Sequence, residues 1–188
     1  NDTVNDIHFS KCGIVLSQNI IKNKTSPIDI SVYIKSFLLL MKPRVMSLVL
    51  FTAMVGLLVA PNEVSFATAS LSLLAVAIGS GAAGALNMWY ESDVDAVMSR
   101  TCLRPIPTGK IKREQALWFG IILSIVSIIM LYMSSNSISA ILLASTIGFY
   151  FFIYTIWLKR KTAQNIVIGG ASGALPPVIG WTIATGSI

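Results

Sequence analysis

The sequence predicts an all-α, polytopic membrane bundle. Its mean hydropathy is +0.75 and only 12% of its residues are charged, which is typical of membrane proteins rather than of soluble domains. Four stretches carry no charge: residues 45–62, 64–90, 115–158 and 162–188. About 20 apolar residues suffice for one helical crossing, and backbone groups in lipid must be paired within a segment, which favours helices. We therefore expect about five transmembrane helices.

The charge-free stretches assign these helices in order. The first two are expected near residues 45–60 and 66–90. The third stretch is long enough for two crossings, and a polar break at residues 134–137 divides it into helices near 115–134 and 138–158. The fifth is expected near 164–186, where Pro176 and Pro177 would free backbone carbonyls that only a cavity or a neighbouring helix can tolerate. We therefore expect a central cavity.

The residues before the first helix are predicted to form a separate region. Residues 1–36 lack Arg and lack a compact apolar segment followed by a small-residue cleavage site, which argues against a secretory signal or transit peptide. We interpret them as a polar cytoplasmic tail, partly helical near residues 28–40, and expect residues 37–188 to form the membrane domain. The chain does not begin with Met and stops inside an apolar run, so we expect it to be a fragment.

Positive charge sets the expected orientation. The 14 Lys and Arg residues all fall on one side of the predicted helices, and short cytoplasmic loops retain such residues. The N-terminus and the loops 91–114 and 159–161 are therefore expected in the cytoplasm. This topology accounts for the net charge of +6 better than nucleic-acid binding does, because a nucleic-acid binder would spread basic residues over a soluble face.

Carboxylates gather in the segment NMWYESDVDAVMSRTCLRP, residues 87–105, at the end of the second helix. If this helix continues past Tyr90, then Asn87, Glu91 and Asp95 share one face, with Asp93 on another side. Like charges one turn apart repel, so a cation is expected between Glu91 and Asp95. Mg²⁺ takes one or two carboxylates together with phosphate oxygens and water.

Basic residues follow the carboxylates. Arg100 and Arg104 lie four residues apart, and Lys110, Lys112 and Arg113 come next; guanidinium groups bind phosphate oxygens in pairs. Carboxylates beside arginines therefore indicate a Mg²⁺-diphosphate site. Two plainer interpretations stay open. The charges could pair only with each other at a wet surface, worth about 0–1 kcal/mol per pair, or the arginines could only hold the loop in the cytoplasm.

Three blocks of sequence resemble a known family. The pattern Asn87-x-x-x-Glu91-x-x-x-Asp95-x-x-Met98-x-Arg100-Thr101-x-x-Arg104-Pro105 resembles the signature of the intramembrane UbiA-type prenyltransferases. LLLMKPRVMSLVLFT, residues 38–52, and YTIWLKRKTAQNIVIGGASGALPPVIGW, residues 154–181, are similar to the branch of that family that farnesylates a porphyrin. The resemblance implies the UbiA-type helical fold around a cavity that opens sideways to lipid.

The resemblance also implies an activity and its residues. A farnesyl group would pass from farnesyl diphosphate to the 2-vinyl group of haem B, and water addition would give haem O. Mg²⁺ would be held by Glu91 and Asp95. The implied catalytic residues are Asn87, Glu91, Asp95, Arg100 and Arg104. The implied substrate-binding residues are Asn87, Arg100, Arg104, Lys110, Tyr154 and Lys159. The implied setting is a bacterial inner membrane, with the lipid bilayer, farnesyl diphosphate, haem B and a haem A synthase or terminal oxidase as partners.

The chain departs from the family pattern in three respects, of which one is Val94, where the family commonly has a larger apolar residue. Glu91 stands where the family more often has Asp, and the second aspartate motif of the family is expected on a later helix, so these residues would hold half of the metal site. Two alternatives stay open. One is a prenyltransferase of the same family with another acceptor, such as a quinone precursor. The other is an ion-coupled transporter using Glu91 and Asp95, although transporter carboxylates usually lie at mid-membrane depth.

Overall fold

The structure is a computed structural model that describes residues 30–158 and 165–187, and in these residues every regular element is helical. The predicted all-α bundle is therefore confirmed. In chain order the elements are α2 (Ile30–Leu40), α3 (Pro43–Val59), α4 (Phe66–Tyr90), α5 (Ser92–Val97), α6 (Arg113–Ser134), α7 (Ser137–Gly148), η1 (Phe149–Leu158) and α8 (Asn165–Thr185).

Local signals set several helix boundaries. Pro43 occupies the start of α3, where its missing N–H leaves no bond unmade. The Ser65 hydroxyl accepts a hydrogen bond of 3.2 Å from the Thr68 N–H at the start of α4. Asn136, in the predicted polar break, caps α7 by accepting from the Ser139 N–H at 2.8 Å. These caps satisfy donors that the first turn of a helix leaves open.

Several of the expected membrane spans are present among the described residues. By length and apolar composition, three of their helices can cross a membrane: Phe66–Tyr90, Arg113–Ser134 and Ser137–Trp157. The pair α2 and α3, bent by 50°, passes the same test together as a fourth. The 17 residues of α3 extend about 26 Å, short of a hydrocarbon layer of about 30 Å. The fifth predicted helix forms as α8.

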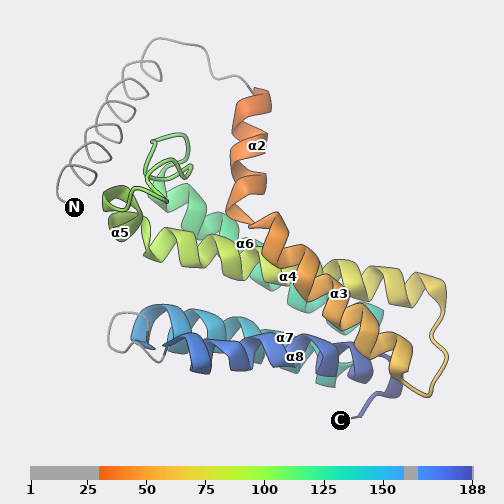
Figure 1. The fold of residues 1–188 in the computed structure, drawn as a ribbon. Helices are drawn as coiled ribbons and strands as arrows, with labels where there is room; N and C mark the ends of the chain where they lie inside the picture. Colours follow the sequence, from red (N-terminus) through yellow and green to blue (C-terminus); the bar gives the residue numbers. More distant parts are fainter. Residues whose placement is uncertain (1–29, 159–164, 188) are drawn as a thin grey trace.

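The helix α2 crosses the boundary that we expected after residue 36. Ser36 and Leu40 are buried, and the Phe37 ring meets that of Phe119 on α6 edge-on, with centroids 4.8 Å apart. Figure 1 shows α2 rising from the bundle at its junction with α3. Residues 1–29 of the expected tail and the loop 159–161 lie outside the described residues.

Small residues bring the helices close together. α4 packs most extensively on α6, and α3 on α8 (Figure 1). A Cβ atom added at Gly180 of α8 would lie 2.0 Å from the Ala53 carbonyl oxygen of α3, and one at Gly56 of α3 would lie 2.0 Å from the Pro177 carbonyl oxygen. The two backbones are therefore in direct contact, as small residues permit in membrane helices.

The fourth predicted helix is not a uniform α-helix. It begins as α7 and continues as the π-helix η1, so the predicted helix over residues 138–158 forms, but its second half has the wider π-helical turn. The Thr155 hydroxyl donates to the Tyr150 carbonyl five residues earlier at 2.9 Å, which reinforces the wider turn. π-helical turns are frequent at functional sites, and η1 borders the site described next.

Candidate active site at the charged end of the bundle

The acidic residues lie across a break between two helices. α4 ends at Tyr90, Glu91 has φ −90° and ψ 3°, and α5 begins at Ser92. The predicted helix over residues 66–90 therefore forms, but it does not continue unbroken past Tyr90, which was the condition for the shared face. The Ser92 hydroxyl donates to the Trp89 carbonyl at 2.9 Å, and such side-chain bonds compete with the helix.

The expected spacing nevertheless survives the break. The Glu91 N–H donates to the Asn87 carbonyl at 3.1 Å, and the Asp95 N–H donates to the Glu91 carbonyl at 2.8 Å. Asn87, Glu91 and Asp95 are 1%, 9% and 4% exposed, whereas Asp93 is exposed. The predicted group of Asn87, Glu91 and Asp95 is thus buried together at the end of α4, with Asp93 outside it.

Arg104 joins this group from the loop that precedes α6. Its Nη1 atom lies 2.6 Å from Asp95 Oδ2, and the two side chains are 26% and 5% exposed. The Thr101 hydroxyl donates to the Asp95 carbonyl at 3.2 Å, and the Thr108 hydroxyl donates to the Arg104 carbonyl at 2.9 Å. The loop is therefore folded onto α5, and the pair is largely removed from water, unlike the wet surface pair of the plainer interpretation.

Lys42 joins the group from the opposite side, at the junction of α2 and α3. Its Nζ atom donates to Asn87 Oδ1, and the Asn87 amide nitrogen donates to the Thr155 hydroxyl at 3.3 Å. The Asn87 carboxamide is therefore held between the junction of α2 and α3 on one side and η1 on the other. Sequence reasoning used Lys42 only to predict the topology and did not place it in the site. The signal that could have indicated the site was its position before Pro43 in the block 38–52.

Two tyrosines of η1 border the group. The Tyr150 carbonyl accepts from the Thr155 hydroxyl, which in turn accepts from Asn87, and the Tyr150 ring stacks on that of Tyr154 with centroids 5.1 Å apart and planes at 30°. The Tyr154 ring fills the space that a Cβ atom at Gly169 of α8 would occupy, at 2.5 Å. Tyr154 was predicted from the sequence and Tyr150 was not.

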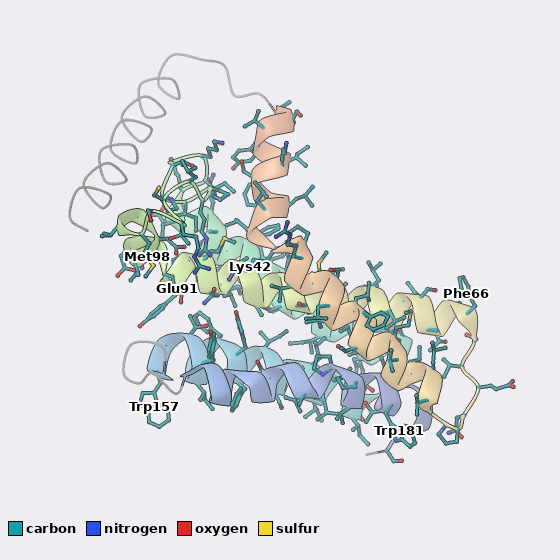
Figure 2. All side chains as sticks on the ribbon, in the orientation of Figure 1. Lys42, Phe66, Glu91, Met98, Trp157 and Trp181 are labelled. Atoms are coloured by element: carbon teal, nitrogen blue, oxygen red, sulfur yellow. The ribbon has the colours of Figure 1, made fainter. Side chains whose placement is uncertain are left out.

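An apolar cavity of about 290 Å³ lies between α3, α4, α7, η1 and α8, and Lys42 and Tyr150 are among the residues that line it. Its walls are mainly aliphatic side chains and glycines, among them Leu48, Val49, Val76, Leu143, Ile147 and Pro176. The cavity predicted from the two prolines of the fifth helix is therefore confirmed. Figure 2 shows Glu91, Met98 and Trp157 at one end of the bundle and Phe66 and Trp181 at the other.

The structure does not bring every predicted residue to this group. Arg100 and Lys110 are exposed on the loop between α5 and α6, and Lys159 lies outside the described residues. In residues 30–158 and 165–187, no three His, Cys, Asp or Glu side chains lie close enough together to hold a metal ion. Among the described residues, Glu91 and Asp95 are the buried carboxylates that this end of the bundle offers to a metal.

Comparison with known proteins identifies related sequences. The family model described as the UbiA prenyltransferase family matches residues 49–188. A protoheme IX farnesyltransferase of Pelagibacter ubique is 69% identical over 149 residues, covering 79% of this chain and 49% of that protein. Proteins of the same name from Methylobacterium radiotolerans and Ehrlichia ruminantium are 57% and 52% identical over 155 and 168 residues, covering 82% and 89% of this chain and 49% and 57% of the relatives.

The chain spans about half the length of these relatives. No solved structure matches it. Its apolar helices and the family match together indicate a multi-pass membrane protein.

Proposed function

The chain belongs to the UbiA prenyltransferase family, and from this premise we propose that the complete protein transfers a farnesyl group from farnesyl diphosphate to the 2-vinyl group of haem B, forming haem O. Relatives that are 52–69% identical carry the name protoheme IX farnesyltransferase. Their similarity extends through the blocks that contain Lys42, Asn87 and Tyr154, since the match to one relative covers 89% of this chain.

The observation that carries this proposal is the joining of a buried charged group to an apolar cavity. Asn87, Glu91, Asp95, Arg104 and Lys42 gather at one end, and Lys42 also lines the cavity of about 290 Å³. An isoprenyl diphosphate has the same division, with a charged head and a hydrocarbon tail. Apolar surface prefers an apolar cavity, and phosphate prefers cationic donors. The site therefore fits such a substrate in one orientation, with the diphosphate at the charged group and the hydrocarbon tail in the cavity.

The two carboxylates of the charged group suit a Mg²⁺ ion that also binds the diphosphate. Glu91 and Asp95 offer carboxylate oxygens one turn apart in a buried setting, and Mg²⁺ commonly takes one or two carboxylates with phosphate oxygens and water. Arg104 uses Nη1 on Asp95, and a guanidinium has five N–H donors, so the same side chain can also face phosphate. When bound, Mg²⁺ would neutralise negative charge on the departing pyrophosphate.

The proposed reaction proceeds through bond cleavage before bond formation. The C1–O bond of farnesyl diphosphate breaks, and its electron pair leaves with pyrophosphate. The vinyl π electrons of haem B then form a carbon–carbon bond with C1. The cation left beside the porphyrin takes up water and loses a proton. Arg104 and Lys42 lower the barrier to the first step because their positive charges are in place before the pyrophosphate separates.

The proposal includes a location and a recipient. The charged end would lie on the cytoplasmic side of a bacterial inner membrane. The basic loop between α5 and α6 belongs to this end, and cytoplasmic loops retain basic residues. Water-soluble pyrophosphate could then leave on that side. The apolar product would remain in the bilayer, where a haem A synthase or a terminal oxidase would collect it.

An assay of membranes containing the complete protein tests this function. Farnesyl diphosphate, haem B and Mg²⁺ should yield a more hydrophobic haem of the expected mass. Asp95→Asn should abolish the product, because it removes a buried carboxylate of the charged group. Glu63→Gln is the matched control, since Glu63 is an exposed carboxylate in the loop between α3 and α4 and should leave the rate unchanged.

Other outcomes would distinguish the alternatives. Prenylation of a quinone precursor but not of haem B would keep the family chemistry and change the acceptor. Ion flux without farnesyl diphosphate would indicate a transporter. Full turnover by Asp95→Asn would show that the charged group is not the diphosphate site.

A further inference from the structure

The Tyr150 ring lies where the charged group meets the cavity. Tyr150 lines the cavity together with Lys42 of the charged group, and its carbonyl is linked to Asn87 through the Thr155 hydroxyl. Among the described residues that line the cavity, Tyr150 is the one that carries an aromatic ring. Lys42 also reaches both regions, but it contributes a positive charge rather than an electron-rich face.

That boundary is where the reactive carbon of an isoprenyl diphosphate would lie. In the proposed function, the diphosphate is held by the charged group and the hydrocarbon tail by the cavity. C1 joins these two parts of the substrate, so it lies at their junction. Heterolysis of the C1–O bond sends the electron pair to pyrophosphate and leaves an allylic cation on the carbon side of the boundary.

We propose that Tyr150 is a catalytic residue whose ring stabilises the allylic cation formed at the mouth of the cavity. The face of an aromatic ring is electron-rich and attracts cations within about 6 Å of its centroid, most strongly where water is excluded. The neutral diphosphate ester carbon gains little from this attraction. The contact therefore favours the transition state over the bound substrate, which is the requirement for raising kcat.

The surroundings hold the Tyr150 ring in place. Tyr154 stacks against it at 5.1 Å, and Tyr154 itself packs onto Gly169. The Tyr150 carbonyl accepts the hydroxyl hydrogen bond of Thr155 at 2.9 Å, and Thr155 in turn accepts from Asn87 at 3.3 Å. The π-helical turn thus links the position of the ring to that of the charged group. An aromatic group fixed before the reaction does not have to reorganise as charge develops.

Two other roles for Tyr150 make different predictions. A hydroxyl that donates to pyrophosphate would be lost in Tyr150→Phe, whereas a ring that faces the cation would remain. A side chain that only fills space would be replaced adequately by any group of similar size. The aromatic role predicts activity that follows the electron density of the ring.

The test compares substitutions in the complete protein with farnesyl diphosphate as the donor. Tyr150→Phe should keep kcat within about threefold of the unaltered protein, and Tyr150→Leu should lower kcat about tenfold with little change in KM, the loss expected for a cation–π contact. Phe152→Leu is the matched control. It makes the same kind of change on η1 at a side chain that is 63% exposed, and it should leave kcat unchanged.

A fluorination series separates ring electrons from ring size. Phenylalanines with zero to three ring fluorines at position 150 differ little in volume, but each fluorine weakens the negative face of the ring. The logarithm of kcat should fall steadily with the number of fluorines. Because these variants change packing so little, the series also guards against misfolding of Tyr150→Leu.

The inference rests on the proposed function, and the outcomes keep the two apart. An unaltered protein that prenylates its acceptor, together with a flat fluorination series, would overturn the role of Tyr150 alone. Loss of activity in Tyr150→Phe equal to that in Tyr150→Leu would also overturn it in favour of the hydroxyl. An unaltered complete protein that releases no pyrophosphate from farnesyl diphosphate with either haem B or a quinone precursor would overturn both.

Discussion

The ion pair between Arg104 and Asp95 is the best-defined contact of the candidate site. Asp95 is 5% exposed in its side chain and Arg104 26%, so the carboxylate is the more deeply buried partner. A buried charge that loses its partner is strongly destabilising, although the intact pair adds little to stability. The pair is therefore better explained by holding the loop between α5 and α6 over the site than by stabilising the fold.

Removal of one partner should cost more than removal of both. We expect Arg104→Gln to lower the free energy of unfolding by about 3 kcal/mol, because it leaves the Asp95 carboxylate uncompensated. The double variant Asp95→Asn with Arg104→Gln should recover most of that loss while remaining inactive in farnesyl transfer. Chemical unfolding in detergent and the haem assay measure the two effects. Unchanged stability in Arg104→Gln would contradict the burial of the pair.

Lys42 combines an uncommon backbone conformation with a site contact. Its φ is 52° and its ψ is 66°, which places it in the left-handed region that β-branched residues avoid. Its ammonium group donates to Asn87. The backbone and the side chain can therefore be tested separately at one position.

Substitutions at Lys42 should separate folding from binding. Asn tolerates the left-handed region, so Lys42→Asn should fold with normal thermal stability. It should nevertheless lower kcat/KM for farnesyl diphosphate about tenfold or more, because a hydrogen bond to a charged group contributes roughly 1.5–3 kcal/mol. Lys42→Val should show the same catalytic loss and also a lower melting temperature. Equal activity of Lys42→Asn and the unaltered protein would exclude Lys42 from the site.

At the scale of the elements, the sequence predicted the helices better than their irregularities. Charge-free stretches and polar breaks located five helices, because the absence of charge in lipid is a strong signal. The π-helix could not be seen, since each residue of FYFFIYTIWL is apolar or uncharged and periodicity carries no information in such a run. The break at Glu91 depends on the Ser92 hydroxyl bond to Trp89, a local competition that spacing does not reveal.

Sequence reasoning likewise predicted the site residues that are close together in the sequence and missed those that are far apart. Asn87, Glu91, Asp95 and Arg104 are close in sequence, so spacing was enough to predict that they gather. Lys42 and Asn87 are 45 residues apart and Asn87 and Thr155 are 68 apart. Contacts over such separations depend on how the helices pack, and a single sequence does not give that packing. Lys42 and Tyr150 were therefore missed as site residues.

The contact between α3 and α8 makes a prediction about glycine. We expect Gly180→Ala to destabilise the protein strongly, because its Cβ would lie 2.0 Å from the Ala53 carbonyl oxygen and 2.8 Å from the Leu57 nitrogen. These are backbone atoms that cannot rotate away, so the helices would have to separate. Overpacking of this kind typically costs about 1–3 kcal/mol, and occasionally more.

Gly170→Ala is the matched control on the same helix. A Cβ atom at Gly170 meets nothing within 4 Å, and Ala is favoured over Gly within a helix by about 1 kcal/mol. Its melting temperature in detergent should be unchanged or higher, while that of Gly180→Ala should fall. Equal melting temperatures for the two variants would contradict the direct backbone contact.

At the scale of the whole molecule, basic residues and the candidate site occupy the same end of the bundle. Arg100, Arg104, Lys110, Lys112 and Arg113 belong to the loop between α5 and α6 or the start of α6, and Figure 2 shows Glu91 and Met98 at this end of the bundle. At the other end, the loop between α3 and α4 contains Glu63 and no Lys or Arg. A site for an anionic head group at the basic end can receive its substrate from the aqueous phase that retains those residues.

The difference in basic residues between the two ends predicts that the loop with Glu63 lies outside the cell and the loop with Gly109 lies in the cytoplasm. An epitope tag inserted after Glu63 should be cut by protease added outside intact cells, whereas a tag after Gly109 should be cut only after the membrane is opened. Both insertion points, Glu63 and Gly109, are exposed loop residues. The positive-inside bias is the physical reason for the expected difference. If both tags were cut in intact cells, α4 would not cross the bilayer, and the candidate site could not lie on the cytoplasmic side.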